Sequence, residues 1–152
     1  MRKLGFLSLS FLLLAACSSL NYKSLRKQES LWSLSWTSGS CFRSCPVYNA
    51  HIDQNGILHF TGIRHCKQQG DTSIQLEDYF QYEVLDSLES KSFLELDSAY
   101  GINPGVMDVP INGIELSSGK RQKQVRYQLD APDNLNSLIK WLNQVLRDQE
   151  LI

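Results

Sequence analysis

The sequence predicts an α+β domain with a mostly antiparallel sheet of about five strands and two helices packed on one face. Three observations support this fold class. Several short segments alternate apolar and polar residues, as half-buried strands do, and two longer segments repeat apolar residues with a helical period. The 152 residues are 42% hydrophobic and 20% charged, a composition that suits one globular domain. The predicted element order is β-β-β-α-β-β-α.

The N-terminal segment predicts export. A basic start, MRK, precedes an apolar run over residues 4–14, which is shorter than the about 20 residues that a membrane-spanning helix needs. The run ends in LAAC at residues 14–17, which resembles the bacterial lipobox. The resemblance implies cleavage after Ala16 and attachment of diacylglycerol and an acyl chain to Cys17. The alternative is an ordinary signal cut after Ala16, which leaves Cys17 as a thiol.

The residue after this cysteine bears on location. Ser18 follows Cys17, and no Asp stands there to resemble an inner-membrane retention signal, so we expect the outer membrane and a periplasm-facing position. The predicted organisation is a signal peptide over 1–16, a lipidated N-terminus and tether over 17–30, and one domain over 31–152. The expected partners are the lipid bilayer, through acylated Cys17, and an envelope protein. The near-neutral charge predicts no nucleic-acid partner.

The first half of the domain predicts three strands. Residues 31–36 alternate as one strand, and a Ser-Gly-Ser turn follows at 38–40. Residues 47–63 form a hairpin, because the segment 53–56, DQNG, suits a type I turn with Gly56 in the left-handed conformation. The three-residue loop pairs His51 with His59 and Ile52 with Leu58, which keeps the apolar side chains on one face. Residues 64–71 are polar and predict a loop.

The second half predicts a helix, a hairpin and a final helix. Residues 76–90 carry a helical apolar stripe, and residues 100–110 form a loop rich in Pro and Gly. Apolar residues alternate on both sides of the turn at 118–120, and a last amphipathic helix begins at Pro132. The second hairpin has a basic outer face, which is either a solvated surface or a patch for lipid or a partner; its residues are Lys120, Arg121, Lys123 and Arg126.

A cysteine motif stands directly before the first hairpin. Residues 41–48, CFRSCPVY, resemble the signature Cys-Phe-Gly-x-Cys-Pro-x-Tyr of a family of uncharacterised bacterial lipoprotein domains. The turn at 53–56, the first helix, the Asp108-x-Pro110 segment and the last helix follow in the family's order, so the resemblance covers about residues 31–148. Arg43 stands where the family usually has Gly, and Met107 where it usually has Thr. The resemblance implies the fold and the location but no chemistry.

The cysteines have several possible partners. In the oxidising periplasm, Cys41 and Cys45 are candidates for a disulfide if residues 42–44 make a turn. Cys66 is a rival partner for either one, because the hairpin register places it near Cys45. The remaining alternative is free or metal-bound thiols, and Cys41, Cys45, His65 and Cys66 together suit a soft metal.

The other residue patterns predict little chemistry. His51 and His59 lie side by side on the polar face near Asp53, either as a metal-binding pair or as exposed strand residues. The sequence contains no G-x-S-x-G, H-E-x-x-H, P-loop or G-x-G-x-x-G motif, and no cofactor is indicated. We therefore expect a non-enzymatic binding or structural domain on a membrane anchor. The alternative is a periplasmic thiol-redox or soft-metal protein that uses Cys41 and Cys45.

Overall fold

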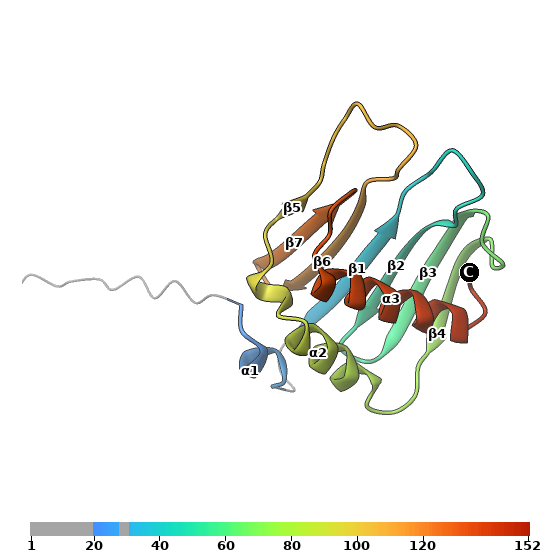
Figure 1. Cartoon of the computed structure of the whole chain (residues 1–152). Coiled ribbons are helices and arrows are strands. Elements are labelled where there is room, and N and C mark those ends of the chain that lie inside the picture. The colour runs from blue at the N-terminus through green and yellow to red at the C-terminus, as the bar shows by residue number, and fades with distance from the viewer. Residues whose placement is uncertain (1–19, 28–30) are drawn as a thin grey trace, which may run out of the picture.

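A computed structural model describes residues 20–27 and 31–152 of the chain. These residues form a single sheet with helices on one side (Figure 1). The helices are α1 (Tyr22–Leu25), α2 (Phe80–Ser90) and α3 (Asp133–Asp148), with a short 3-10 turn, η1, at Phe93–Glu95. The strands are β1 (Trp32–Ser38), β2 (Val47–Asp53), β3 (Ile57–Arg64), β4 (Gly70–Gln75), β5 (Ala99–Tyr100), β6 (Asn112–Ser118) and β7 (Arg121–Tyr127).

The described residues form one seven-stranded sheet in the order β4-β3-β2-β1-β6-β7-β5. Every neighbouring pair is antiparallel except β5 and β7. Connections between consecutive antiparallel strands are short because a hairpin needs only a few residues to reverse the chain. The α+β class and the mostly antiparallel sheet are therefore confirmed.

The core lies between the sheet and the helices α2 and α3, which Figure 1 shows on the same face. The apolar residues that alternate along β1, β2, β3 and β6 point to this face, and burying each large side chain contributes about 1.5–3 kcal/mol. Tyr48 links the two layers, because its hydroxyl donates a hydrogen bond to Asn143 Oδ1 of α3 at 2.6 Å. Burial raises the pKa of this phenol to about 12. The largest fully buried side chains include Leu34, Ile52, Phe60, Leu85, Phe93 and Leu138.

The predicted β2–β3 hairpin has the predicted register. His51 pairs with His59 and Ile52 with Leu58, and Gly56 has a φ of 74°. That left-handed conformation favours glycine because it has no Cβ. The carboxylate of Asp53 closes the turn by accepting hydrogen bonds from the backbone N–H groups of Asn55 and Ile57 at 2.8 and 3.1 Å. The prediction is correct because turn chemistry and side-chain alternation both require the same pairing.

The predicted number of elements is wrong, since the described residues hold seven strands and three helices. β4 lies partly within the predicted loop and pairs with β3 as an edge strand, and β5 has only two residues. β4 also explains why α2 begins at Phe80 rather than near Leu76: the chain is still extended at Gln75. Tyr79, expected within the helical stripe, precedes the helix at a φ of 71° and is 71% exposed.

The predicted outer face of the second hairpin is also corrected. β6 and β7 pair through a two-residue turn, because Ser118 lies opposite Arg121. Side chains alternate along β7, so Arg121 and Lys123 share the helix-covered side with buried Val125, whereas Arg126 is exposed on the other side. The four basic residues therefore do not form one face.

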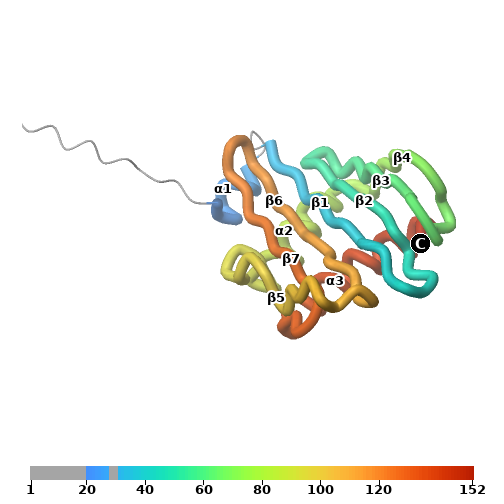
Figure 2. The backbone as a smooth tube through the Cα atoms, turned by 90° about the horizontal axis from the view of Figure 1, so that it is seen from above, coloured from blue at the N-terminus to red at the C-terminus, as the bar shows by residue number. Residues whose placement is uncertain are grey.

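The two ends of the sheet have different surroundings. Trp32 begins β1 opposite Ser118 and close to the end of β2, and a cavity at this end is lined by Trp32, Leu25 of α1 and Asn55 of the β2–β3 turn. We call this the α1 end. At the other end, β1 finishes at Ser38, and β2 and β6 begin. Figure 2 shows α1 and the loops of this second end on opposite sides of the molecule.

Candidate functional site

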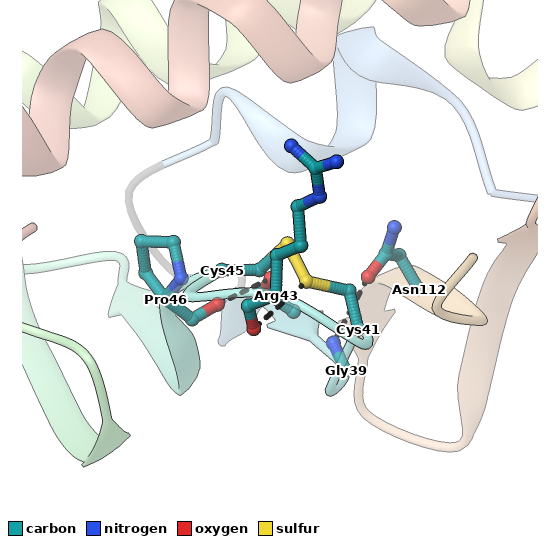
Figure 3. The surroundings of a disulfide bond; sticks show 7 residues. Gly39, Cys41, Arg43, Cys45, Pro46 and Asn112 are labelled. Atoms are coloured by element: carbon teal, nitrogen blue, oxygen red, sulfur yellow. Dashed lines mark hydrogen bonds between the residues drawn. A yellow bond between two sulfur atoms is a disulfide. The ribbon is translucent and has the colours of Figure 1, made fainter. Parts of the chain in front are cut away.

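A disulfide joins Cys41 and Cys45 in the loop between β1 and β2 (Figure 3). Their Cα atoms lie 5.9 Å apart, whereas four residues of extended chain would span about 13 Å. Residues 42–44 therefore make the turn that this pairing needs. The Arg43 side chain points away from the disulfide in Figure 3, so an arginine at this position is compatible with the turn.

Hydrogen bonds fix the base of this loop. The Ser38 hydroxyl donates to the carbonyl oxygen of Pro46 at 2.8 Å, and the Gly39 backbone N–H donates to Asn112 Oδ1 at 2.9 Å. A Cβ atom on Gly39 would lie 2.9 Å from the Ile111 carbonyl oxygen, so the close approach of the two segments requires glycine. These contacts attach the disulfide loop to the start of β6 (Figure 3).

A second loop, residues 101–111, lies beside the disulfide loop and is held by Gln128. This side chain is only 8% exposed. Its Nε2 donates to the carbonyl oxygens of Val106 and Val109 at 2.8 Å each, and its Oε1 accepts from the Asn103 backbone N–H at 2.7 Å. One buried amide thus satisfies three backbone groups, each of which would cost free energy if it were left buried and unpaired.

We call residues 39–46 and 101–111 together the disulfide pole. Two large apolar side chains stand out from it: Phe42 is 86% exposed and Met107 is 87% exposed. Between the loops lies a shallow groove of about 420 Å³, lined by Cys41, Phe42, Arg43, Cys45, Asp108, Val109 and Pro110. The pole therefore offers apolar contact area with one basic and one acidic side chain beside it.

Cys66 is not bonded to either cysteine of the pole. Its thiol is buried and lies 3.3 Å from the Val47 carbonyl oxygen, to which it donates. The rival disulfides with Cys66 are therefore absent. The proposed cluster with His65 is not formed either, because Cys41 and Cys45 are joined to each other. Across residues 20–27 and 31–152, no group of three or more His, Cys, Asp or Glu side chains is arranged to hold a metal ion.

His51 and His59 lie side by side on the open face of the sheet, with ring centroids 5.7 Å apart. His51 Nδ1 is 3.0 Å from the Ser35 hydroxyl on β1, and His59 Nδ1 is 2.8 Å from the Ser73 hydroxyl on β4. Burial, reinforced by the neighbouring His59, lowers the pKa of His51 despite Asp53. A neutral imidazole can ligate a metal, but Asp53 is engaged in the turn, and within the described part of the chain no third His, Cys, Asp or Glu completes a metal site with this pair.

The position of the predicted lipid attachment, Cys17, lies outside the described residues. Within the described ranges, no helix combines the length and the apolar character that crossing a bilayer demands.

Sequence reasoning missed the exposure of two residues of the pole and the two side chains that hold its loops. Phe42 and Met107 are apolar residues in loops, where exposure depends on the surrounding fold. Gln128 follows β7 as one polar residue among several, and nothing local marks it or Asn112 as important. The signals that the sequence carried were the cysteine motif at 41–48 and the segment around Asp108 and Pro110, through their places in the family pattern.

The fold and this site define a small α+β domain with one open sheet face and a disulfide-closed loop at one end. The chain belongs to the family described as a domain of unknown function, DUF6438, which it matches over residues 33–146. The matched region contains both cysteines of the disulfide, Gln128 and both loops of the pole. Comparison with curated proteins gives no significant match.

Proposed function

We propose that the protein is a lipid-anchored envelope protein at the outer membrane, facing the periplasm, whose non-enzymatic domain binds a protein partner through the disulfide pole. The observation that carries this proposal is the pair of exposed side chains, Phe42 and Met107, on two fixed loops at the end of the sheet farthest from α1. Phe42 lines the groove together with Asp108, the chain neighbour of Met107, so the two exposed apolar side chains belong to adjoining loops. Grouped apolar surface of this kind favours a binding role.

The sequence supports the anchor. A signal-like segment ends in the motif LAAC, and cleavage before Cys17 would leave this residue at the new N-terminus. One acyl chain gives only marginal membrane binding, whereas two or three chains hold a protein firmly. An anchor at Cys17 would attach the protein next to α1 and leave the disulfide pole at the far end.

The chemistry of the pole indicates the kind of partner. Phe, Met and Arg are enriched at protein interfaces, and binding energy concentrates in a few well-fixed side chains. The disulfide and Gln128 limit the motion of both loops, so little conformational entropy would be lost on binding. The expected partner is an envelope protein with an apolar surface that receives Phe42 and Met107.

Crosslinking in intact envelopes tests this proposal. The full chain is compared with a variant that combines Phe42→Ala and Met107→Ala, and with Tyr79→Ala as the matched control, because Tyr79 is an exposed aromatic residue outside the pole. We expect at least about ten-fold less crosslinked product with the double variant than with the wild-type chain, because ten-fold corresponds to a loss of about 1.4 kcal/mol of binding free energy. The Tyr79→Ala variant should give as much crosslinked product as the wild-type chain. Equal capture by the double variant, or equal loss in the control, would reject the pole as the binding surface.

A further inference from the structure

The segment that precedes β1 is fastened to the domain rather than free. Leu25 of α1 is 1% exposed in the core. The Tyr22 hydroxyl donates to the Leu88 carbonyl oxygen at 2.9 Å and accepts from the Leu94 backbone N–H at 3.2 Å. Arg26 pairs with two carboxylates of α2, at 2.6 Å from Asp86 and 2.5 Å from Glu89. The expected tether over residues 17–30 therefore contains a docked helix.

This docking shortens the connection to the membrane. Leu20 is the first described residue and already packs against the core. It follows Cys17 by three positions, and three residues of chain reach at most about 11 Å. If Cys17 carries the lipid, as the proposed function requires, the surface around Leu20 must lie close to the headgroups. The domain then has little freedom to swing away from the bilayer.

The surface around Leu20 is basic. A shallow cavity of about 710 Å³ is lined by Leu20, Leu94, Lys120, Arg121, Gln122 and Lys123. Lys120 is exposed at the tip of the β6–β7 turn, whereas Lys123 is turned inward and donates to the Leu96 carbonyl oxygen.

The charges of α1 extend this basic surface. Lys23 and Lys27 are exposed, and Arg26 pairs with both Asp86 and Glu89, so this group of three side chains keeps one net negative charge. Glu95 and Asp97 flank Leu96, whose carbonyl oxygen accepts from Lys123, and both are exposed. The Asp53 carboxylate also lies at the α1 end, where it accepts two backbone hydrogen bonds of the β2–β3 turn. The exposed cations of this surface are therefore Lys23, Lys27 and Lys120.

We infer that the domain contacts the membrane with its α1 end and binds anionic phospholipid headgroups through Lys23, Lys27 and Lys120. Electrostatic attraction to a charged bilayer acts within a Debye length, about 8 Å at physiological ionic strength. The short connection from Cys17 keeps these lysines within that range, so the attraction persists in salt. The strands then lead away from the bilayer. The disulfide pole faces the periplasm, because its loops lie across the sheet from α1 (Figure 1).

Fluorescence quenching in vesicles tests this orientation. The acylated full chain is placed in vesicles of phosphatidylethanolamine and phosphatidylglycerol that carry a headgroup quencher. A fluorophore is attached under non-reducing conditions to Gln122→Cys, in the same cavity as Lys120, or, as the distal control, to Met107→Cys, while native Cys66 stays buried. We expect several-fold stronger quenching at position 122 than at position 107. Equal quenching at the two positions, or stronger quenching at 107, would overturn the orientation.

Charge variants test the recognition of headgroups with the fluorophore at position 122. Combining Lys23→Glu with Lys27→Glu, or replacing phosphatidylglycerol with phosphatidylcholine, should reduce the quenching by at least half. Lys140→Glu is the matched control, because Lys140 is exposed on α3. Quenching that is insensitive to both changes would reject anionic headgroups as the ligand.

Intact mass of the same samples separates this inference from the proposed anchor. A mass without acyl chains would refute the anchor itself. A correctly acylated protein that shows no stronger quenching at position 122 than at position 107 would refute only the orientation.

Discussion

His51 shows how the fold alters the ionisation of one side chain. The ring lies half-buried between Ser35 and His59, and its environment disfavours the charged form because water is partly excluded and a second imidazole lies beside it. The pKa of His51 in the folded protein is therefore below the unfolded value of about 6.5. The folded state binds fewer protons than the unfolded chain. The stability that this group contributes is fully present above about pH 6.5 and is lost as the pH falls through the folded pKa.

The first prediction follows from the lowered pKa of His51. The free energy of unfolding of the wild-type protein should fall between pH 7 and pH 5, and His51→Gln should reduce that fall. Urea unfolding at both pH values, followed by tryptophan fluorescence, measures the difference. His65→Gln is the matched control, because it removes an imidazole that lies outside the His51–His59 pair. If the free energy of unfolding of His51→Gln falls between pH 7 and pH 5 as much as that of the wild type, the lowered pKa of His51 would be contradicted.

Gln128 shows which residues local sequence reasoning cannot find. Its importance comes from three hydrogen bonds to a loop that lies about 20 residues earlier in the chain, and no periodicity records such contacts. Asp53 is the opposite case. Its turn lies within four residues, so the segment DQNG was sufficient to predict the hairpin.

At the scale of elements, the predictable ones are those with an apolar face. The buried leucines of α3 follow the predicted stripe, and β2 and β3 alternate as expected. β4 was missed because an edge strand packs little: Thr72 and Ile74 alone turn toward the helices. β5 is too short for any pattern, and α1 is held by contacts with α2 and η1 rather than by its own helix propensity.

The disulfide loop carries the second prediction. Replacing both Cys41 and Cys45 with Ser should lower the free energy of unfolding by about 2 kcal/mol, the chain-entropy value for so short a loop. Chemical denaturation of the oxidised wild type and of the double variant measures this. If the domain acts by binding and the disulfide is structural, we expect mild reductant to leave the Cys41–Cys45 bond intact while the domain remains folded.

Two outcomes would contradict a structural bridge. One is equal stability of the two proteins, and the other is a bridge that opens in mild reductant without loss of the fold. The second outcome would instead favour the thiol-redox alternative for Cys41 and Cys45.

At the scale of the whole molecule, the two ends of the sheet carry surfaces with different chemistry. The α1 end carries exposed lysines and is close in sequence to Cys17, whereas the disulfide pole carries exposed Phe42 and Met107. An anchored domain of this kind would hold its binding loops one strand length, about 23 Å for seven residues, beyond the α1 end. The fold class and the first hairpin were predictable from the sequence, but this division was not, because it depends on which loops meet at each end.

The most direct test of the account is metabolic labelling of the producing cells with a labelled fatty acid, comparing the wild-type chain with Cys17→Ser. We predict that the purified wild-type protein carries the label and leaves membranes only in detergent, while the variant is unlabelled. An unlabelled wild-type protein that washes off membranes in buffer would contradict the lipid anchor and, with it, the proposed function.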